Sequence, residues 1–209
     1  MNNYFIILAA GLGKRFDNKK PKQYFIYKNK ELFEHSVEKA IKSKLFKKII
    51  LVSDNPKKIK RKFNKDVLII KGGKERSNSS LIALKKIKKF KPTNVLIHDA
   101  ARPDFSIKLL KNLLLQLKNN KAVIPSVKSR DSIKYKIGKH IFNLNRDKII
   151  STQTPQAFKF KELYNLSKNQ SDKITDEATL FINKNFKIKF ISGENKNNKI
   201  TYADDLNQQ

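Results

Sequence analysis

The sequence YFIIL (residues 4–8) leads directly into AAGLGKRFDNKKPKQY (residues 9–24). The apolar run is typical of a buried strand. The glycines after it let the backbone approach a ligand closely and offer N–H groups to phosphate oxygens. Arg15 and Lys22 add two positive charges to the same loop. Gly11 and Gly13 alone indicate little, because short Gly-x-Gly turns are common at strand ends, but the whole segment points to a nucleoside triphosphate.

Beyond this segment, short apolar runs alternate with stretches whose apolar residues have helical spacing. Buried strands are predicted at 4–10, 48–53, 67–70, 94–98 and 122–125. Helices are predicted between them, at 32–43, 56–63, 77–90 and 106–117. The alternation indicates parallel strands joined by right-handed crossovers, an α/β sandwich. Ligands collect beyond the carboxyl ends of such strands, so we expect the loops at Gly11, Gly72 and Asp99 to converge.

The pattern changes after Pro125. Segments 132–136 and 139–144 flank Gly138 and predict a hairpin that forms an arm outside the main sheet. Helical patterns resume at 160–167 and 175–183, and a strand is predicted at 186–191. No internal repeat or linker divides the chain, so we expect a single domain over residues 1–209, with the arm at about 131–144.

The formal net charge of +29 suggests nucleic acid or an anionic membrane as a partner. However, 41 lysines spread over nearly every segment account for most of it, against six arginines. A dedicated nucleic-acid site normally concentrates arginine and aromatic residues on one face. We therefore interpret the charge as solvated lysine faces and expect neither a nucleic-acid nor a membrane partner.

The content of cysteine and histidine excludes several classes of site. The absence of cysteine rules out a disulfide framework and thiolate metal sites, and it is compatible with the cytoplasm. Three widely separated histidines argue against a zinc site. No apolar run reaches the length of a membrane span, and the N-terminus lacks the pattern of a secretory signal. We expect a cytoplasmic protein.

A second glycine-rich turn, GGKERSNS (residues 72–79), lies where a predicted strand meets a helix. Its paired glycines permit a backbone turn against a planar base, and Ser77, Asn78 and Ser79 have groups that can bind base edges. The alternative is a turn that only caps the following helix. The company of the first glycine loop favours a binding role.

The segment HDAARP (residues 98–103) ends the fourth predicted strand. A carboxylate there, Asp99, is well placed to hold Mg²⁺ or a ribose hydroxyl. Ala100 and Ala101 leave room for a ligand, and Arg102 offers a fork for a second phosphate. The alternative is a structural ion pair between Asp99 and Arg102; we favour the ligand role. We interpret His98 as a packed strand residue rather than a catalyst.

Three further segments carry candidate residues. Arg146 is followed by TQTPQAF (residues 152–158), in which Pro155 restricts Thr154 to an extended conformation that we expect to present its hydroxyl outward. At Thr175-Asp176-Glu177 a helix begins, and capping is a stronger interpretation than catalysis. Lys199, judged alone, is one more surface lysine.

Taken in order, AAGLGKR, PKQY, GGKERSNS, HDAARP, TQTPQAF, TDEA and NKITYADDL resemble the 2-C-methyl-D-erythritol 4-phosphate cytidylyltransferases of the non-mevalonate isoprenoid pathway. The resemblance runs from Ile6 to Leu206. It implies a Rossmann-like three-layer sandwich with a mostly parallel sheet, of the nucleotide-diphospho-sugar transferase type, and a protruding β-hairpin arm. It also implies the reaction: CTP and methylerythritol phosphate give the CDP-methylerythritol and pyrophosphate, with Mg²⁺ as cofactor.

The resemblance also assigns roles to residues. Arg15 and Lys22 stabilise the α-phosphate, the 10–14 loop cradles the triphosphate, and segment 72–79 reads the cytosine. The implied catalytic residues are Arg15, Lys22, Arg146 and Lys199. The implied nucleotide-binding residues are Ala10, Gly11, Gly13, Lys14, Gly72, Gly73, Ser79, Asp99 and Ala100. The implied acceptor-binding residues are Asp99, Arg102, Ser132, Arg146, Thr154 and Lys199, and Asp99 is the implied metal ligand.

Family members are homodimers, so the resemblance implies that the arm reaches the active site of a second copy. Ser132 stands where the family usually has threonine, which keeps the hydroxyl but loses a methyl group beside the acceptor. The family's chains usually continue into a C-terminal helix beyond the position of Leu206, which leaves open a minimal form or part of a longer chain.

Two rival functions remain open. A cytidylyltransferase for another polyol phosphate, such as ribitol 5-phosphate, shares most of these motifs. A basic protein that binds RNA or membranes on the same fold is a rival from a different class, and salt-sensitive RNA binding without CTP turnover distinguishes it.

Overall fold

The computed structural model describes residues 1–11, 13, 16, 20–59, 63, 66–169 and 174–206. In these residues an eight-stranded sheet has the order β10-β7-β11-β6-β1-β4-β5, with β12 beside β7. Its strands are β1 (Asn3–Ala9), β4 (Lys48–Ser53), β5 (Val67–Lys71), β6 (Asn94–Asp99), β7 (Ala122–Lys128), β10 (Ile150–Thr152), β11 (Gln156–Lys159) and β12 (Lys189–Ser192). Strands β5, β4, β1 and β6 run parallel, as the alternating pattern predicts.

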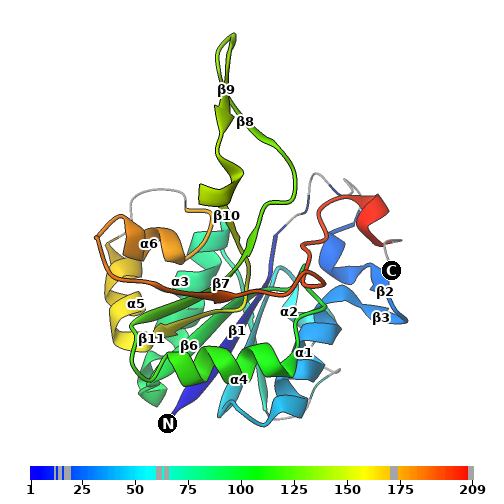
Figure 1. Cartoon of the computed structure of the whole chain (residues 1–209). Helices are drawn as coiled ribbons and strands as arrows, with labels where there is room; N and C mark the ends of the chain where they lie inside the picture. The colour runs from blue at the N-terminus through cyan, green and yellow to red at the C-terminus, as the bar shows by residue number, and fades with distance from the viewer. Residues whose placement is uncertain are drawn as a thin grey trace.

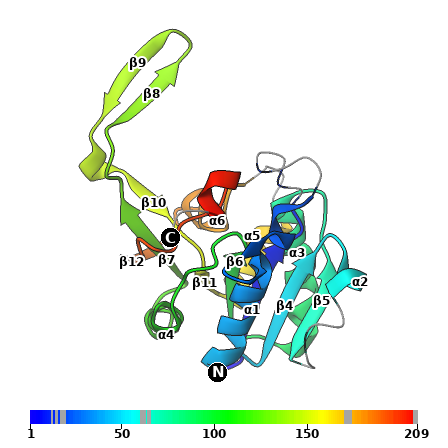
Figure 2. The ribbon, with the colours of Figure 1, turned by 90° about the vertical axis from the view of Figure 1, so that its right-hand side faces the viewer.

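Helices cover both faces of the sheet (Figures 1 and 2). They are α1 (Leu32–Ser43), α2 (Pro56–Ile59), α3 (Arg76–Ile87), α4 (Ile107–Gln116), α5 (Phe160–Lys168) and α6 (Ala178–Ile182). Four short 3₁₀ helices are η1 (Lys22–Tyr24), η2 (Lys88–Phe90), η3 (Arg146–Lys148) and η4 (Ala203–Leu206). The sequence predicts α1 and β4 with the bounds observed. Residues 60–62, part of the predicted 56–63 helix, lie outside the described residues.

The apolar run of β1 places alternate side chains on opposite faces, because side chains in a strand alternate with a period of two. Phe5 and Ile7 pack in one core with α1 and α4, whereas Tyr4 and Ile6 pack in the other with α3, α5 and α6. All four are buried. A strand with both faces buried reads as a continuous apolar run, which is why residues 4–8 show no polar alternation.

Two strands differ from the prediction. The segment TQTPQAF was assigned to neither a strand nor a helix, but its second half forms β11, which runs antiparallel between β6 and β7. Residues 150–152 form β10, antiparallel to β7. Both are short and lie beside Pro155, so no apolar periodicity marks them. The sheet is therefore mostly rather than wholly parallel.

The predicted arm is a hairpin of β8 (Ile133–Ile137) and β9 (His140–Leu144), which pair only with each other. It projects away from the sandwich (Figures 1 and 2). A second small hairpin joins β2 (Ile26–Tyr27) to β3 (Lys30–Glu31). In the described part of the chain, no helix is both long and apolar enough to cross a membrane.

Candidate functional site

A pocket of about 300 Å³ lies beyond the carboxyl ends of β1, β5 and β6, where the sequence predicted convergence. Seven of the residues implied to bind nucleotide line it: Ala10, Gly11, Gly13, Gly73, Ser79, Asp99 and Ala100. Lys22 and Lys199 also line it. The predicted residues Lys14 and Arg15 lie outside the described residues. Its size is typical of a small-molecule site.

The turn after β5 approaches the loop after β1 very closely. Gly72 N–H donates to Ser53 O at 2.9 Å, and Gly73 N–H donates to Ser79 Oγ at 3.0 Å. A Cβ on Gly72 would lie 2.4 Å from the Cβ of Ala10, and one on Gly73 would lie 2.6 Å from the Cβ of Asn78. Glycine is needed at both positions because a Cβ would overlap the side chain of Ala10 or of Asn78. The Ser79 hydroxyl, predicted to contact cytosine, holds this turn while the residue lines the pocket.

Gly72→Ala is expected to lower the free energy of unfolding by about 1–3 kcal/mol, because the added methyl overlaps Ala10. Gly11→Ala is the matched control: no atom lies within 4 Å of an added Cβ there, so its stability should stay within about 0.5 kcal/mol of the parent. Urea denaturation of both variants tests this. Equal stability of the two variants contradicts the close approach.

Asp99, at the end of β6, lies between two cations. Arg76 Nε donates to its Oδ1 at 2.9 Å, and Lys199 Nζ donates to its Oδ2 at 2.7 Å. Arg76 Nη1 also donates to both carboxylate oxygens of Glu177, at 2.9 and 3.0 Å. Burial alone raises the pKa of Asp99, but Arg76 and Lys199 outweigh burial and hold that pKa well below its usual range. The two cations therefore favour the ionised form of this carboxylate.

Arg102 is not the partner of Asp99 that one interpretation expected. Its Nη1 donates to Asn197 O at 2.8 Å and its Nη2 to Thr152 O at 3.4 Å. The two terminal guanidinium nitrogens, which were predicted to bind a phosphate, are thus bonded to backbone carbonyl oxygens. Arg102 fastens the C-terminal segment to the strand ends, and it is not among the residues that line the pocket.

Thr154 is buried, and the expectation that its hydroxyl points outward is wrong. Thr154 Oγ1 accepts from Asp99 N–H at 3.0 Å and lies 3.1 Å from His98 Nδ1. His98 Nε2 lies 3.1 Å from Arg102 O, which can only accept, so Nδ1 is left to accept from the threonine hydroxyl. The fully buried His98 is a packed strand residue, as predicted, and burial lowers its pKa to about 3.

Ser132 and Arg146 lie on the arm, away from this pocket. Lys134 Nζ donates to Ser132 Oγ at 3.1 Å, and Arg146 Nη1 donates to Arg130 O at 3.2 Å. Both predicted residues are exposed. Within one chain, the structure does not bring them to the nucleotide pocket.

Lys22, from the N-terminal part of the chain, is hydrogen-bonded to the C-terminal segment. Lys22, in η1, donates from Nζ to Ile200 O at 2.9 Å, so two segments 178 residues apart meet at the pocket. Ile200 is anchored in turn: its N–H donates to Ala101 O, and its side chain packs against Tyr27 and Leu32. The pairing explains why Lys199, next in the chain, also faces the pocket.

Neither Arg76 nor Glu177 was given a role at the site in the sequence analysis. Glu177 was interpreted as part of a helix start, yet its carboxylate is 1% exposed and pairs with Arg76. Asp176, its neighbour, does the capping by accepting from Thr179 N–H at 3.2 Å. The rarity of arginine was a usable signal for Arg76, because each arginine in a lysine-rich chain marks a place where a planar donor matters.

The chain is similar to known proteins over nearly its whole length. The family model described as 2-C-methyl-D-erythritol 4-phosphate cytidylyltransferase matches residues 4–209. The chain is 48% identical over 208 residues to the "Bifunctional enzyme IspD/IspF" of Pelagibacter ubique, covering 99% of this chain but 56% of that relative's length. It is 35% identical over 215 residues to the 2-C-methyl-D-erythritol 4-phosphate cytidylyltransferase of Caldicellulosiruptor bescii, covering 99% of this chain and 95% of that one.

A crystal structure of the Francisella tularensis 2-C-methyl-D-erythritol 4-phosphate cytidylyltransferase has a TM-score of 0.85 to this fold. The two are 31% identical, over 99% of this chain and 97% of that one. The sheet, the arm and the ordered motifs agree with these likenesses. The chain belongs to the 2-C-methyl-D-erythritol 4-phosphate cytidylyltransferase family, a family of nucleotidyltransferases.

Proposed function

We propose that this chain transfers CMP from CTP to 2-C-methyl-D-erythritol 4-phosphate and releases pyrophosphate, a step of isoprenoid precursor synthesis. One observation carries the proposal: two glycine turns, Lys22, Lys199 and an ionised Asp99 converge on one pocket in a chain of this family. We place the reaction in the cytoplasm, where CTP is made. The chain has no cysteine and therefore does not depend on disulfides, which are rare in that reducing compartment.

The chemistry needs no general base, because the attacking phosphate oxygen of the acceptor is already anionic near neutral pH. A bond forms between that oxygen and the α-phosphorus, and the bond from the α-phosphorus to the oxygen bridging the β-phosphorus breaks. The barrier lies in bringing two polyanions together and stabilising charge on the α-phosphate. Fixed cations and backbone N–H groups do this work.

Lys22 is the described residue that we assign to the α-phosphate, together with Arg15, seven positions earlier in the chain. Its ammonium lies at the pocket wall, and its contact to a carbonyl oxygen is easily exchanged for a phosphate oxygen. We assign Lys199 to the acceptor phosphate. The Gly72–Gly73 turn, which brings backbone against the pocket, is the surface that we assign to the cytosine ring.

The donor set suits Mg²⁺ that arrives with the nucleotide. Mg²⁺ is usually bound by one or two carboxylates together with substrate phosphates, and not by a cage made only of protein groups. No group of three or more histidine, cysteine or acidic side chains suited to a metal occurs in the described ranges, whereas Asp99 supplies one ionised carboxylate at the pocket. When bound, the ion neutralises charge on the triphosphate.

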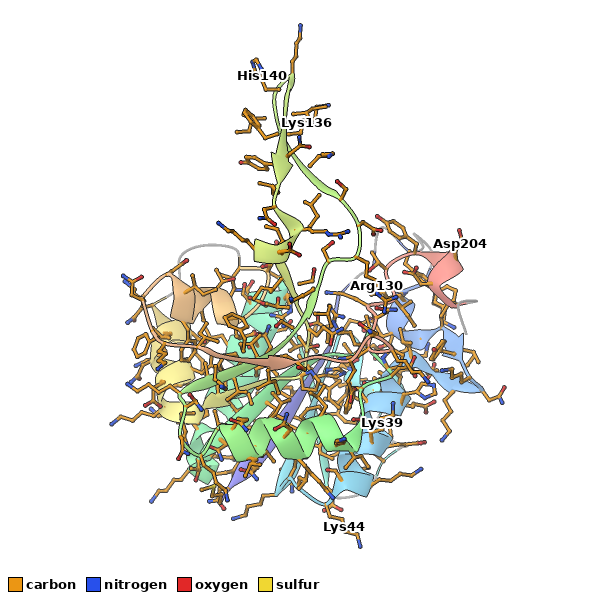
Figure 3. All side chains as sticks on the ribbon, viewed as in Figure 1. Lys39, Lys44, Arg130, Lys136, His140 and Asp204 are labelled. Carbon is orange, nitrogen blue, oxygen red and sulfur yellow. The ribbon has the colours of Figure 1, made fainter. Side chains whose placement is uncertain are left out.

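We further propose that the protein is a homodimer whose arm covers a second copy. Opposite residues of an antiparallel pair share a face. The register therefore puts the pairs Ile133–Leu144, Tyr135–Phe142 and Ile137–His140 on one side of the arm, and the pairs Lys134–Asn143 and Lys136–Ile141 on the other. Tyr135 is 53% exposed and Phe142 is 49% exposed. Figure 3 shows the arm's side chains projecting clear of the sandwich, with Lys136 and His140 near its tip.

An isolated two-stranded hairpin is marginally stable in water. We therefore expect the side of the arm that carries Tyr135 and Phe142 to be covered by another chain, which would stabilise the hairpin. A second copy is the occupant that also accounts for Arg146. This residue lies at the base of the arm, outside its own pocket, and the arm carries it toward a neighbouring chain.

Tyr135→Ser combined with Phe142→Ser is expected to convert the dimer into a monomer and to lower turnover by about 10-fold or more, because Arg146 is then misplaced. Sedimentation equilibrium against the 24.3 kDa chain mass measures the first effect. Lys134→Ser combined with Lys136→Ser, on the opposite side of the same arm, should stay dimeric. A dimeric Tyr135/Phe142 variant, or a monomeric parent, contradicts this assembly.

The reaction itself is tested by incubating the purified chain with CTP, Mg²⁺ and methylerythritol phosphate and following pyrophosphate. Phosphorus NMR should show one diphosphodiester product per pyrophosphate. CTP hydrolysis to CMP without that product contradicts the proposed function.

A further inference from the structure

Two cations bind the same carboxylate at the pocket, and they differ in how firmly they are held. The Arg76 side chain is 21% exposed, and the Lys199 side chain is 38% exposed. Asp99 between them is 12% exposed. A carboxylate this buried is costly to leave without a cation, because its desolvation is compensated only by pairing. Because Lys199 is more exposed than Arg76, we expect an entering ligand to displace Lys199 from Asp99 more easily than Arg76.

Arg76 is fixed from several directions. It is the first residue of α3, and its guanidinium reaches Asp99 through Nε and Glu177 through Nη1. Glu177 is 1% exposed and directly precedes α6, so the arginine ties α3 to the start of α6. Both bonds from Nη1 go to one carboxylate, a charge-assisted contact that restricts the orientation of the guanidinium.

One atom of this cluster is unsatisfied. Arg76 Nη2 is buried and has no hydrogen-bond partner in the described part of the chain. A guanidinium that serves only to join two helices is expected to satisfy all its buried donors. Arg76 also lines the pocket, so its role is not limited to joining α3 to the start of α6.

Lys199 is held differently. It lies on the extended C-terminal segment, its ammonium meets Asp99 Oδ2 at 2.7 Å, and its flexible stem is partly in solvent. If it leaves, Asp99 keeps the Arg76 bond, so the carboxylate is not left without a cation. If Arg76 is lost, Asp99 keeps only the more exposed and more flexible cation.

We propose that Arg76, held by Glu177, is the positioning residue that keeps Asp99 in place at the nucleotide pocket while Lys199 exchanges between Asp99 and a substrate phosphate. The exchange rests on the proposed function, because it takes a phosphate as the new partner of Lys199. The fixed role of Arg76 rests on the geometry alone. In this proposal Arg76 positions Asp99, and Lys199 binds the substrate phosphate.

The test compares two charge-removing variants of the same carboxylate's partners. Arg76→Gln is expected to weaken CTP binding by about 10-fold or more in titration calorimetry, measured with and without Mg²⁺. Lys199→Gln is expected to change CTP binding by about 3-fold or less, yet to lower kcat by about 10²-fold because it meets the acceptor. Equal weakening of CTP binding, or stronger weakening in Lys199→Gln, overturns the proposal.

Three further variants separate positioning from folding. Arg76→Lys keeps the charge but cannot reach Asp99 and Glu177 together, so its CTP affinity should fall between those of the parent and Arg76→Gln. Glu177→Gln should also weaken CTP binding. Glu194→Gln is the structural control, because Glu194 accepts from Ser106 N–H at 2.8 Å away from the pocket and should cost stability alone. An Arg76→Gln that fails to fold leaves the Arg76→Lys and Glu177→Gln affinities to decide, and parental CTP affinity in both overturns the proposal.

These results are separable from the reaction. A parent that binds CTP but makes no pyrophosphate with methylerythritol phosphate overturns the proposed function, while the ranking of CTP affinities still decides the role of Arg76. A parent with normal turnover whose Arg76→Gln variant binds CTP normally overturns only the positioning role.

Discussion

Lys22→Ala is expected to lower kcat by about 10²–10³-fold while the KM for CTP changes only a few-fold. Lys22 lines the pocket, and in the proposed reaction it lies where charge on the α-phosphate grows as the acceptor attacks. An interaction that strengthens only in the transition state appears in kcat rather than in binding. Steady-state pyrophosphate release at saturating methylerythritol phosphate measures both constants.

Lys20→Ala is the matched control in the same loop. Lys20 is exposed, and its ammonium lies 5.0 Å from the centre of the Phe25 ring rather than in the pocket. Both kinetic constants of this variant should equal those of the parent. A Lys22→Ala enzyme with parental kcat, or one whose loss lies wholly in the KM for CTP, removes Lys22 from the transition state.

Asp99→Asn is expected to lower the free energy of unfolding by up to about 3 kcal/mol and kcat/KM for CTP by about 10²-fold. The substitution keeps the shape but leaves Arg76 and Lys199 without their shared carboxylate. The stability cost stays at the low end for a buried pair, because Arg76 retains Glu177 and Lys199 can return to water. Guanidinium denaturation and CTP kinetics measure the two effects.

Asp104→Asn serves as the control for removing a carboxylate charge. Asp104 pairs with Lys28 at 3.3 Å, and its side chain is 27% exposed. It lies off the pocket, and a pair this exposed contributes about 1 kcal/mol or less. Its kcat/KM for CTP should be parental. If Asp104→Asn loses as much stability and activity as Asp99→Asn, Asp99 has no special role in the pocket.

The parts of the fold that carried a strong local pattern were predictable. The buried runs at β1, β4 and β6 and the amphipathic helix α1 follow from periodicity. The parallel order of the predicted strands places the loops at Gly11, Gly72 and Asp99 at one edge of the sheet. Strand β11 was not predictable, because a four-residue strand inserted antiparallel beside Pro155 has neither the length nor the alternation that marks a strand.

The site shows the same division. Glycines and a carboxylate at strand ends are visible in sequence because local geometry demands them. The pairing of Arg76 with Glu177, 101 residues apart, depends on tertiary packing alone. Thr154 and Arg102 were placed by motif, yet their partners depend on tertiary packing. Thr154 accepts from Asp99 N–H, and Arg102 donates to the carbonyl oxygens of Asn197 and Thr152.

The central claim, cytidylyl transfer to methylerythritol phosphate, is tested most directly by acceptor selectivity. The measurement is kcat/KM for pyrophosphate release from CTP and Mg²⁺ with methylerythritol phosphate and, in parallel, with ribitol 5-phosphate. We predict a preference of about 10²-fold or more for methylerythritol phosphate. Faster turnover with ribitol 5-phosphate, or no pyrophosphate with either acceptor, contradicts the claim.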